Sequence, residues 1–200
     1  MFTLEVLMEF GTPAQKQKFL LPLLRGEMRS TFLMTEPAVA SSDPTNLATI
    51  LQKKILNPVT KSVEYTLTGK KWWSTGAGDP RCGVAVVVAK MDYSHPSCQQ
   101  EQQQQSSFNN KNSSSSVSNA KHGAHTIVLV PLPHPGVRVK RALTVMGYDD
   151  APVGHAEVEL NGVRITTEEL VLGEGSGFRV SQARLGPGRI HHCMRAIGMG

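Results

Sequence analysis

Residues 156–165 read AEVELNGVRI and indicate the class of fold. Apolar residues alternate with polar ones along this stretch, which is the pattern of a β-strand with one buried face. Asn161 and Gly162, in the middle of the stretch, both tolerate a positive φ. We therefore expect a tight hairpin here, with one strand over 156–160 and the next beginning at Val163.

Similar strand patterns recur along the chain on both sides of this stretch. Val63, Tyr65 and Leu67 fall on one side of a strand, and we expect Gly69 to turn the chain into residues 70–73. Further strand-like runs occupy 84–89, 127–130 and 137–139. Because no helical pattern of ten or more residues separates these runs, a parallel βαβ sheet is disfavoured and an antiparallel barrel or sandwich is expected.

Helical patterns lie at both ends of the chain. Apolar residues recur at helical spacing within 1–11, and Thr12, Pro13 and Gln15 have the types expected at an N-cap, a first helical position and a capping-box partner. Pro22 predicts a helix end or kink, because it lacks a backbone N–H and clashes with the preceding turn. Helical character returns after residues 173–177. We therefore expect both termini to be cuts through helical regions.

Composition and charge argue against several classes of protein. The chain has 200 residues, 21 Lys plus Arg against 16 Asp plus Glu, and a net charge of +5. The basic residues are scattered and aromatic residues are few, so nucleic acid is not an expected partner. The longest apolar run, 84–89, is far shorter than the ~20 residues of a membrane-spanning helix. Three widely separated cysteines indicate neither a disulfide framework nor a zinc site.

One segment has the composition of a disordered insertion. Gln, Ser and Asn make up most of residues 99–119, which leaves too little apolar surface to offset the entropy cost of ordering them. We expect residues 94–121 to form a disordered loop that bridges two neighbouring strands. The cost of closing a loop grows only slowly with its length, so the fold can tolerate it.

Several familiar site patterns do not match. The glycine-rich stretch 173–177 satisfies neither G-x-G-x-x-G nor G-x-x-x-x-G-K-S/T and is interpreted as a strand-to-helix linker. His191 and His192 are adjacent and point to different faces of a helix, so no shared metal is expected. A G-x-S-x-G nucleophile elbow is also absent from the sequence.

Two other stretches would suit a binding site when taken together, although singly Trp73 is more often a core residue and Thr35-Glu36-Pro37 is more often a turn. In 32–43, FLMTEPAVASSD, a short apolar strand leads into small and hydroxyl residues whose backbone N–H groups can approach an anion. In 71–78, KWWSTGAG, both tryptophans precede a hydroxyl pair and a glycine-rich turn. An indole face can stack on a planar ring while Thr75 or a backbone N–H meets its heteroatoms.

These two stretches, together with 143–155 (LTVMGYDDAPVGH), 172–178 (LGEGSGF) and 184–195 (RLGPGRIHHCMR), resemble the acyl-CoA dehydrogenase family. The resemblance extends in order over nearly the whole chain apart from the insertion. The Trp-Trp form and the GYDDAP and PGRIHHCMR strings look most like the subgroup often fused to a phosphotransferase-like domain, which this sequence does not contain.

The resemblance implies an α+β chain in three parts. Residues 1–29 would be the tail of an N-terminal helical domain, and 30–175 would be an FAD-binding middle β-domain, an antiparallel barrel or sandwich. Residues 176–200 would begin a C-terminal helical domain.

The resemblance also implies the roles of individual residues. Phe32, Met34 and Thr35 would line the flavin, Ser41 would lie where FAD and acyl-CoA meet, and Trp73 would pack on the isoalloxazine ring. Ser74 belongs to the same cofactor set, and Thr75 would bond near the hydride-accepting nitrogen. Substrate contacts would come from Leu185, Gly186 and Arg189, in addition to Ser41.

The reaction implied by the family is α,β-dehydrogenation of a fatty acyl-CoA in β-oxidation, with electrons passed to an electron-transfer flavoprotein. The carboxylate that acts as base normally lies in the C-terminal bundle, and no acidic residue of this chain matches its motif. No catalytic residue and no metal ligand is therefore assigned. Family members are typically mitochondrial or peroxisomal, and they are dimers or tetramers.

Two other interpretations stay open. The chain could be a truncated remnant that binds FAD or acyl-CoA without catalysis. It could also be a β-sandwich binding module unrelated to flavin, in which case the ordered motif matches would be coincidence.

Overall fold

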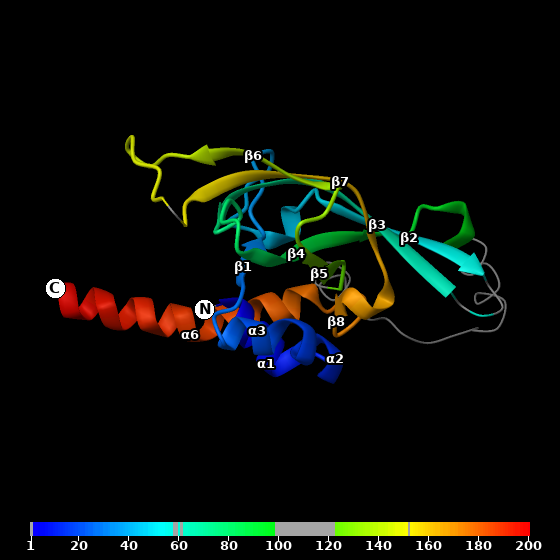
Figure 1. The fold of residues 1–200 in the computed structure, drawn as a ribbon, viewed down its shortest axis with the longest axis horizontal. Coiled ribbons are helices and arrows are strands. Elements are labelled where there is room, and N and C mark those ends of the chain that lie inside the picture. Colours follow the sequence, from blue (N-terminus) through cyan, green and yellow to red (C-terminus); the bar gives the residue numbers. More distant parts are fainter. Residues whose placement is uncertain (1, 58–59, 61, 99–122, 152) are drawn as a thin grey trace, which may run out of the picture.

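The computed structural model describes residues 2–57, 60, 62–98, 123–151 and 153–200. It is a mixed α+β fold in which helical segments flank a strand-rich middle, as the sequence predicts (Figure 1). The helices are α1 (Phe2–Phe10), α2 (Pro13–Gln15), η1 (Lys16–Leu20), α3 (Leu21–Leu24) and α6 (Gly177–Met199), with short 3-10 turns at η2 (Pro44–Asn46) and η3 (Thr167–Glu169). The strands are β1 (Arg29–Leu33), β2 (Ile50–Asn57), β3 (Ser62–Thr75), β4 (Cys82–Asp92), β5 (His125–Pro131), β6 (Val137–Leu143), β7 (His155–Ile165) and β8 (Leu170–Val171).

The eight strands form one sheet that is mainly antiparallel. Its order is β6-β7-β3-β2-β4-β5-β8, with β1 paired to β4 alongside this path. Two pairs, β1 with β4 and β2 with β4, are parallel. Within the described residues β6 and β8 end the order, so the sheet is not closed. The α+β class with a mainly antiparallel sheet is therefore confirmed, and of the two expected arrangements, barrel or sandwich, the closed barrel is not formed.

The sheet buries both faces of its central strands, which explains the continuous apolar run at 84–89. Ala85, Val87 and Ala89 belong to an inner core shared with β3 and β7. Val84, Val86 and Val88 belong to an outer core with the N-terminal helices and α6. Figure 1 shows the helices along one side of β4 and β5, and β3, β6 and β7 along the other. A strand covered on both faces has no reason to alternate.

The N-terminal helical segment follows its sequence signals with one difference. Thr12 and Gln15 form the predicted capping box, and the Gln15 amide also donates to the backbone carbonyls of Glu168 and Leu170 at 2.7 and 3.0 Å. The helix does not end at Pro22 but continues to Leu24. A π-helical segment, η1, precedes the proline, and insertions of this kind mark points where the regular bond ladder is interrupted.

Two predicted turns are wrong, because both lie inside continuous strands. β7 runs unbroken through Asn161 and Gly162, which form a bulge where the register with β3 shifts. Gly162 keeps the positive φ, 61°, that motivated the hairpin. β3 likewise passes through Gly69, where a Cβ atom would collide with Thr49. Both glycines serve local geometry within a long strand rather than a reversal of the chain.

The strands on either side of the predicted insertion are confirmed as neighbours. β4 pairs with β5 from Val84 opposite Pro131 to Lys90 opposite His125. Most of the insertion, residues 99–121, lies outside the described residues. The domain limits after residues 29 and 175 stay predictions. None of the helices in the described ranges combines the length and the apolar character needed to cross a bilayer.

Candidate functional site

The structure brings together the two stretches that the sequence singles out. The backbone N–H of Trp72 donates to the carbonyl of Thr35 at 3.1 Å, and the Thr35 hydroxyl donates to the carbonyl of Trp72 at 2.7 Å. These reciprocal bonds join the segment that follows β1 to the last third of β3. Thr35 and the Trp72-Trp73 pair therefore belong to one site, although 37 positions separate Thr35 from Trp72 in the sequence.

A buried ion pair between Lys71 and Glu36 stabilises this junction. Lys71 is fully buried, and its ammonium donates to Glu36 Oε1 at 2.7 Å and to the carbonyls of Met34 and Val88 at 3.0 and 2.8 Å. The Glu36 carboxylate also accepts the backbone N–H groups of Ala48 and Thr49 at 2.6 and 3.0 Å. Five bonds around one ion pair thus connect β3 and β4 with the loop between β1 and β2.

Burial and the charge of the partner shift the pKa of each residue of this pair in opposite directions. Burial lowers the pKa of Lys71 to about 8, against the influence of Glu36. Burial alone would raise the pKa of Glu36, but the Lys71 charge and the hydrogen bonds around the carboxylate hold that pKa below its usual range. The carboxylate is therefore ionised at neutral pH, and the ammonium supplies its counter-charge.

Sequence reasoning assigned no role to this ion pair, although a signal for it exists. The alternation that places Tyr65 and Leu67 in the core also places Lys71 on the same side of β3. A lysine at a core position requires an anionic partner, because an unpaired buried charge is strongly unfavourable. The sequence alone does not show which carboxylate supplies it.

Trp73 presents an aromatic surface at the end of β3. Its side chain is 41% exposed, and its backbone lies in the left-handed region with φ 51°. The indole packs edge-on against the His155 ring, with 5.8 Å between centroids, and lies 6.2 Å from the Trp72 ring. An exposed indole that contacts two other rings offers a flat surface to a ligand.

The neighbouring hydroxyl groups differ in their surroundings. Thr75 is exposed, and its Oγ1 lies 2.9 Å from His155 Nδ1. Its backbone carbonyl accepts the Thr31 hydroxyl at 3.0 Å. Ser74 is buried, with its hydroxyl directed to the carbonyl of Trp72 at 3.5 Å. Of these two, only Thr75 presents its side chain to the surface beside Trp73.

The other predicted cofactor residues have internal partners or lie on a different face. Ser41 Oγ accepts the backbone N–H of Glu36 at 3.0 Å, so its hydroxyl shapes the loop after β1. The side chains of Phe32 and Met34 pack against the outer core, on the helical side of the sheet. Their predicted roles toward a cofactor stay predictions.

The predicted substrate residues lie on α6 at Leu185, Gly186 and Arg189. This helix packs against α1 and β5. Arg189 is exposed, and its guanidinium donates to Gln182 of the same helix at 2.8 Å. Among the described residues, no hydrogen bond or ion pair joins these three residues to Trp73 or Thr75, and their role stays a prediction.

A cavity of about 360 Å³ opens beside Thr75, between the β3–β4 loop and the N-terminal helices. Leu4, Leu23 and Met28 line it on the helical side. Arg29 and Arg81 add positive charge to its wall, Arg81 being paired with Asp79 at 2.8 Å. The cavity therefore combines apolar and cationic walls next to an exposed hydroxyl.

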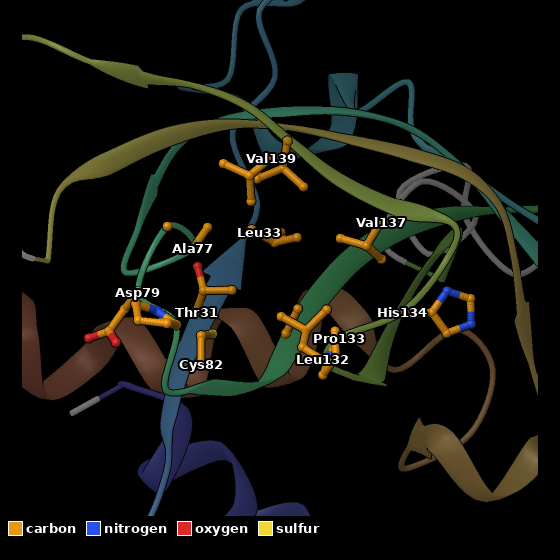
Figure 2. Close-up of a pocket in the computed structure, with 14 residues that line it drawn as sticks. Thr31, Leu33, Ala77, Asp79, Cys82, Leu132, Pro133, His134, Val137 and Val139 are labelled. Atoms are coloured by element: carbon orange, nitrogen blue, oxygen red, sulfur yellow. The ribbon is translucent and has the colours of Figure 1, made fainter.

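A second cavity, of about 330 Å³, lies against the inner face of the sheet. Figure 2 shows Leu33, Val137 and Val139 around it, with Asp79 and His134 on opposite sides. None of the predicted site residues lines this cavity. Among the described residues, no group of three or more His, Cys, Asp or Glu side chains is placed to hold a metal ion.

Comparisons with known proteins define the class. The family model for the acyl-CoA dehydrogenase middle domain matches residues 31–163. Acyl-CoA dehydrogenase family member 11 of Rattus norvegicus is 45% identical over 197 residues, which cover 98% of this chain and 21% of the relative. A Mycobacterium abscessus structure described as a proposed acyl-CoA dehydrogenase has a TM-score of 0.75 and 38% identity, over 98% of this chain and 40% of that one.

Butyryl-CoA dehydrogenase of Megasphaera elsdenii has the same fold, with a TM-score of 0.68 and 26% identity, over 94% of this chain and 40% of that one. The chain thus belongs to the acyl-CoA dehydrogenase family, as the motifs predict. It spans about a fifth to two-fifths of the length of these relatives.

Proposed function

We propose that this chain provides the FAD-binding middle domain of an acyl-CoA dehydrogenase. The observation that carries the proposal is the exposed indole of Trp73, which stands two positions before Thr75, an exposed residue that lines a cavity. A large aromatic group left exposed on an otherwise rigid strand end suits a planar ring system. Residues 31–163 match the middle domain of this oxidoreductase family, which also supports the proposal.

When bound, FAD would supply the hydride acceptor for oxidation of a fatty acyl-CoA thioester. The residues of this chain would bind and orient it. Trp73 would cover one face of the ring, and Thr75 would offer a hydrogen bond at its edge. The buried Lys71–Glu36 pair would hold β3 and the loop after β1 in position next to these two residues. Alignment of this kind is the main contribution of protein to cofactor chemistry.

The substrate and partners of the whole protein are part of the same proposal. An acyl-CoA would contact Ser41 and the helical residues Leu185, Gly186 and Arg189, and an electron-transfer flavoprotein would accept the electrons. The base that removes the α-proton is not assigned to any residue of this chain. Assembly as a homodimer or homotetramer and a mitochondrial or peroxisomal location are expected from the family.

Flavin retention tests this function. The purified chain is mixed with FAD, free cofactor is removed, and the visible absorbance is measured. We expect stoichiometric flavin in the folded chain. A folded but colourless chain would show that residues 1–200 do not hold FAD by themselves and would overturn the proposal of a self-sufficient cofactor domain.

Two substitutions locate the site. Trp73→Ala and Thr75→Ala should each weaken FAD retention while the chain stays folded, because both side chains face outward. We expect about a fivefold loss for Trp73→Ala, since an aromatic contact contributes about 1 kcal/mol beyond its buried area. The control is Leu56→Ala, an exposed apolar residue at the opposite end of the β2–β3 pair. Equal loss of cofactor and of thermal stability in Trp73→Ala would show a purely structural role.

A further inference from the structure

Thr75, His155 and Asp150 form a chain of polar side chains next to Trp73. Thr75 and His155 are opposite one another in the antiparallel pairing of β3 with β7. Thr75 Oγ1 lies 2.9 Å from His155 Nδ1, and the other ring nitrogen, Nε2, lies 3.6 Å from Asp150 Oδ2. The imidazole therefore stands between a hydroxyl group and a carboxylate.

Backbone hydrogen bonds set the position of the three residues. The N–H of Gly76 donates to the carbonyl of Gly154 at 3.1 Å, and the N–H of Gly154 donates to the carbonyl of Asp150 at 2.8 Å. Asp150 has φ 52° and Gly154 has φ 57°, so the loop before β7 folds back toward the end of β3. The Trp73 indole also packs edge-on against the imidazole, with 5.8 Å between the ring centroids. The ring therefore has an aromatic neighbour in addition to its two polar ones.

The two polar neighbours of the imidazole favour one position for its proton. A neutral imidazole carries one N–H, and an ionised carboxylate can only accept a hydrogen bond. Asp150 beside Nε2 therefore favours the tautomer with the proton on Nε2. Nδ1 is then an acceptor, and the single hydroxyl hydrogen of Thr75 is donated to it. Asp150 is largely exposed, with 71% of its side chain accessible, so it biases the tautomer rather than locking it.

We propose that His155 is a positioning residue that turns the hydroxyl hydrogen of Thr75 away from the cofactor site, so that Thr75 meets a ligand only as a hydrogen-bond acceptor. The expected effect on a bound flavin rests on the proposed function, whereas the contacts among Thr75, His155 and Asp150 do not. An acceptor at this position suits a ring nitrogen that carries a hydrogen, which the hydride-accepting nitrogen of a flavin does in the reduced form. His155 would therefore favour reduced over oxidised FAD.

The tautomer can be tested without any cofactor. In the chain labelled with ¹⁵N-histidine, we expect Nδ1 of His155 to resonate as an unprotonated nitrogen and Nε2 as a protonated one. The chain has seven histidines, and the signals absent from His155→Phe assign this one. Thr75→Val should shift the Nδ1 signal of His155 and leave the other histidines unchanged. A proton on Nδ1 would overturn the proposal.

The expected preference for reduced over oxidised FAD is tested by measuring the reduction potential of bound FAD. His155→Phe keeps a ring against Trp73 but removes the acceptor, so the potential should become more negative. A change of about tenfold in the ratio of reduced to oxidised flavin corresponds to about 30 mV for a two-electron couple. His155→Asn, whose amide oxygen can occupy the place of Nδ1, should retain most of the wild-type potential. Asp150→Asn should give a smaller shift in the direction of His155→Phe.

Double variants separate this role from a structural one. In the Thr75→Val background, His155→Phe should cause no further change in potential, because the hydroxyl through which it acts is gone. An equal shift in both backgrounds would overturn the proposal. Retained FAD with an unchanged potential in His155→Phe would also overturn it. Failure of every variant and of the wild type to retain FAD would instead contradict the proposed function, and the tautomer measurement would still decide the position of the proton.

Discussion

At the scale of single residues, the ion pair of Lys71 and Glu36 is the least expected feature of the molecule. Both side chains are almost fully buried, at 0% and 3% exposure. Two charges at this depth are tolerated because the surrounding carbonyl and N–H groups satisfy them. The pair connects residues next to the junction of Thr35 and Trp72, so the geometry of the candidate site depends on two buried charges.

Removing one partner of this pair should be far more costly than removing both. We expect Lys71→Met to lower the free energy of unfolding by about 3–5 kcal/mol, because it leaves the Glu36 carboxylate buried without a counter-charge. The double variant Lys71→Met/Glu36→Gln should recover part of this loss. Urea denaturation at neutral pH measures both. Equal stability of Lys71→Met and wild type would contradict the role assigned to the pair.

Glu174 provides a second residue-scale prediction, on pH. Its carboxylate accepts the hydroxyls of Tyr65 and Tyr93 at 2.6 and 3.0 Å and lies 3.1 Å from the Lys53 ammonium. Burial acts to raise the pKa of Glu174, but these partners outweigh burial and hold it below its usual range. Between the ordinary glutamate pKa and the lowered pKa of native Glu174, the unfolded chain therefore binds more protons than the native chain. The free energy of unfolding thus decreases as the pH falls through this window.

We accordingly expect Glu174→Gln to cost about 1–2 kcal/mol at pH 7, since hydrogen bonds to a charged group are lost. The difference from wild type should shrink as the pH falls through the lowered pKa of the native carboxyl group. Urea titrations at a series of pH values from 7 downward provide the measurement. Glu168→Gln, at an exposed position, is the control and should show little effect at any pH. A pH-independent cost for Glu174→Gln would refute the electrostatic explanation.

At the scale of elements, β3 shows how a long strand accommodates a close approach. A Cβ atom at Gly69 would lie 2.8 Å from the Cα of Thr49, so the backbone itself would have to move. We expect Gly69→Ala to destabilise the fold by about 1–3 kcal/mol through overpacking. Gly78→Ala, where nothing lies within 4 Å of the added atom, should change stability by less than about 0.5 kcal/mol. Thermal unfolding of the two variants compares them, and equal effects would contradict the steric explanation.

The sequence predicts the elements better than it predicts their arrangement. The strands at 84–89, 127–130 and 137–139 are confirmed, because alternation and apolar runs are local signals. The turns at Gly69 and Asn161-Gly162 are wrong, because a bulge and a turn use the same residue types and only the partner strand distinguishes them. The same difference between local signals and long-range pairing applies to the candidate site. The motifs name Thr35 and the Trp72-Trp73 pair, whereas the contacts made by Lys71 and His155 depend on pairings across the sheet.

At the scale of the whole molecule, the candidate site lies where separate parts of the chain meet. Trp73 and Thr75 end β3, and His155 begins β7 opposite them. The cavity next to Thr75 is closed by Leu4, Leu23 and Met28 from the N-terminal segment. Of the barrel or sandwich expected from the sequence, a closed barrel would have needed pairing between the outermost strands, β6 and β8. Helices α1, η1 and α6 cover the outer core. The end of β3 thus borders this cavity at Thr75.

The connection between β4 and β5 gives the last prediction, at this same scale. The pairing of these strands is complete from Val84 to Lys90, and the N–H of Met91 donates to the carbonyl of Ala124 at 2.7 Å. Before residue 99 the chain is still tied to β2, since Ser97 Oγ accepts the N–H of Ile55 at 2.9 Å. Replacing residues 99–122 with a short Gly/Ser linker should therefore change stability by less than about 1 kcal/mol, because closure entropy depends weakly on loop length.

FAD retention should be unchanged in the same variant, because Trp73, Thr75 and His155 are positioned by β3 and β7. Removing residues 94–122 instead should cost more stability, by about 1 kcal/mol, since the bond from Ile55 to Ser97 is lost as well. Urea denaturation and flavin absorbance of the two deletions are measured side by side. A shorter deletion that keeps its stability but loses flavin would show that residues 99–122 take part in cofactor binding, against the prediction of a passive insertion.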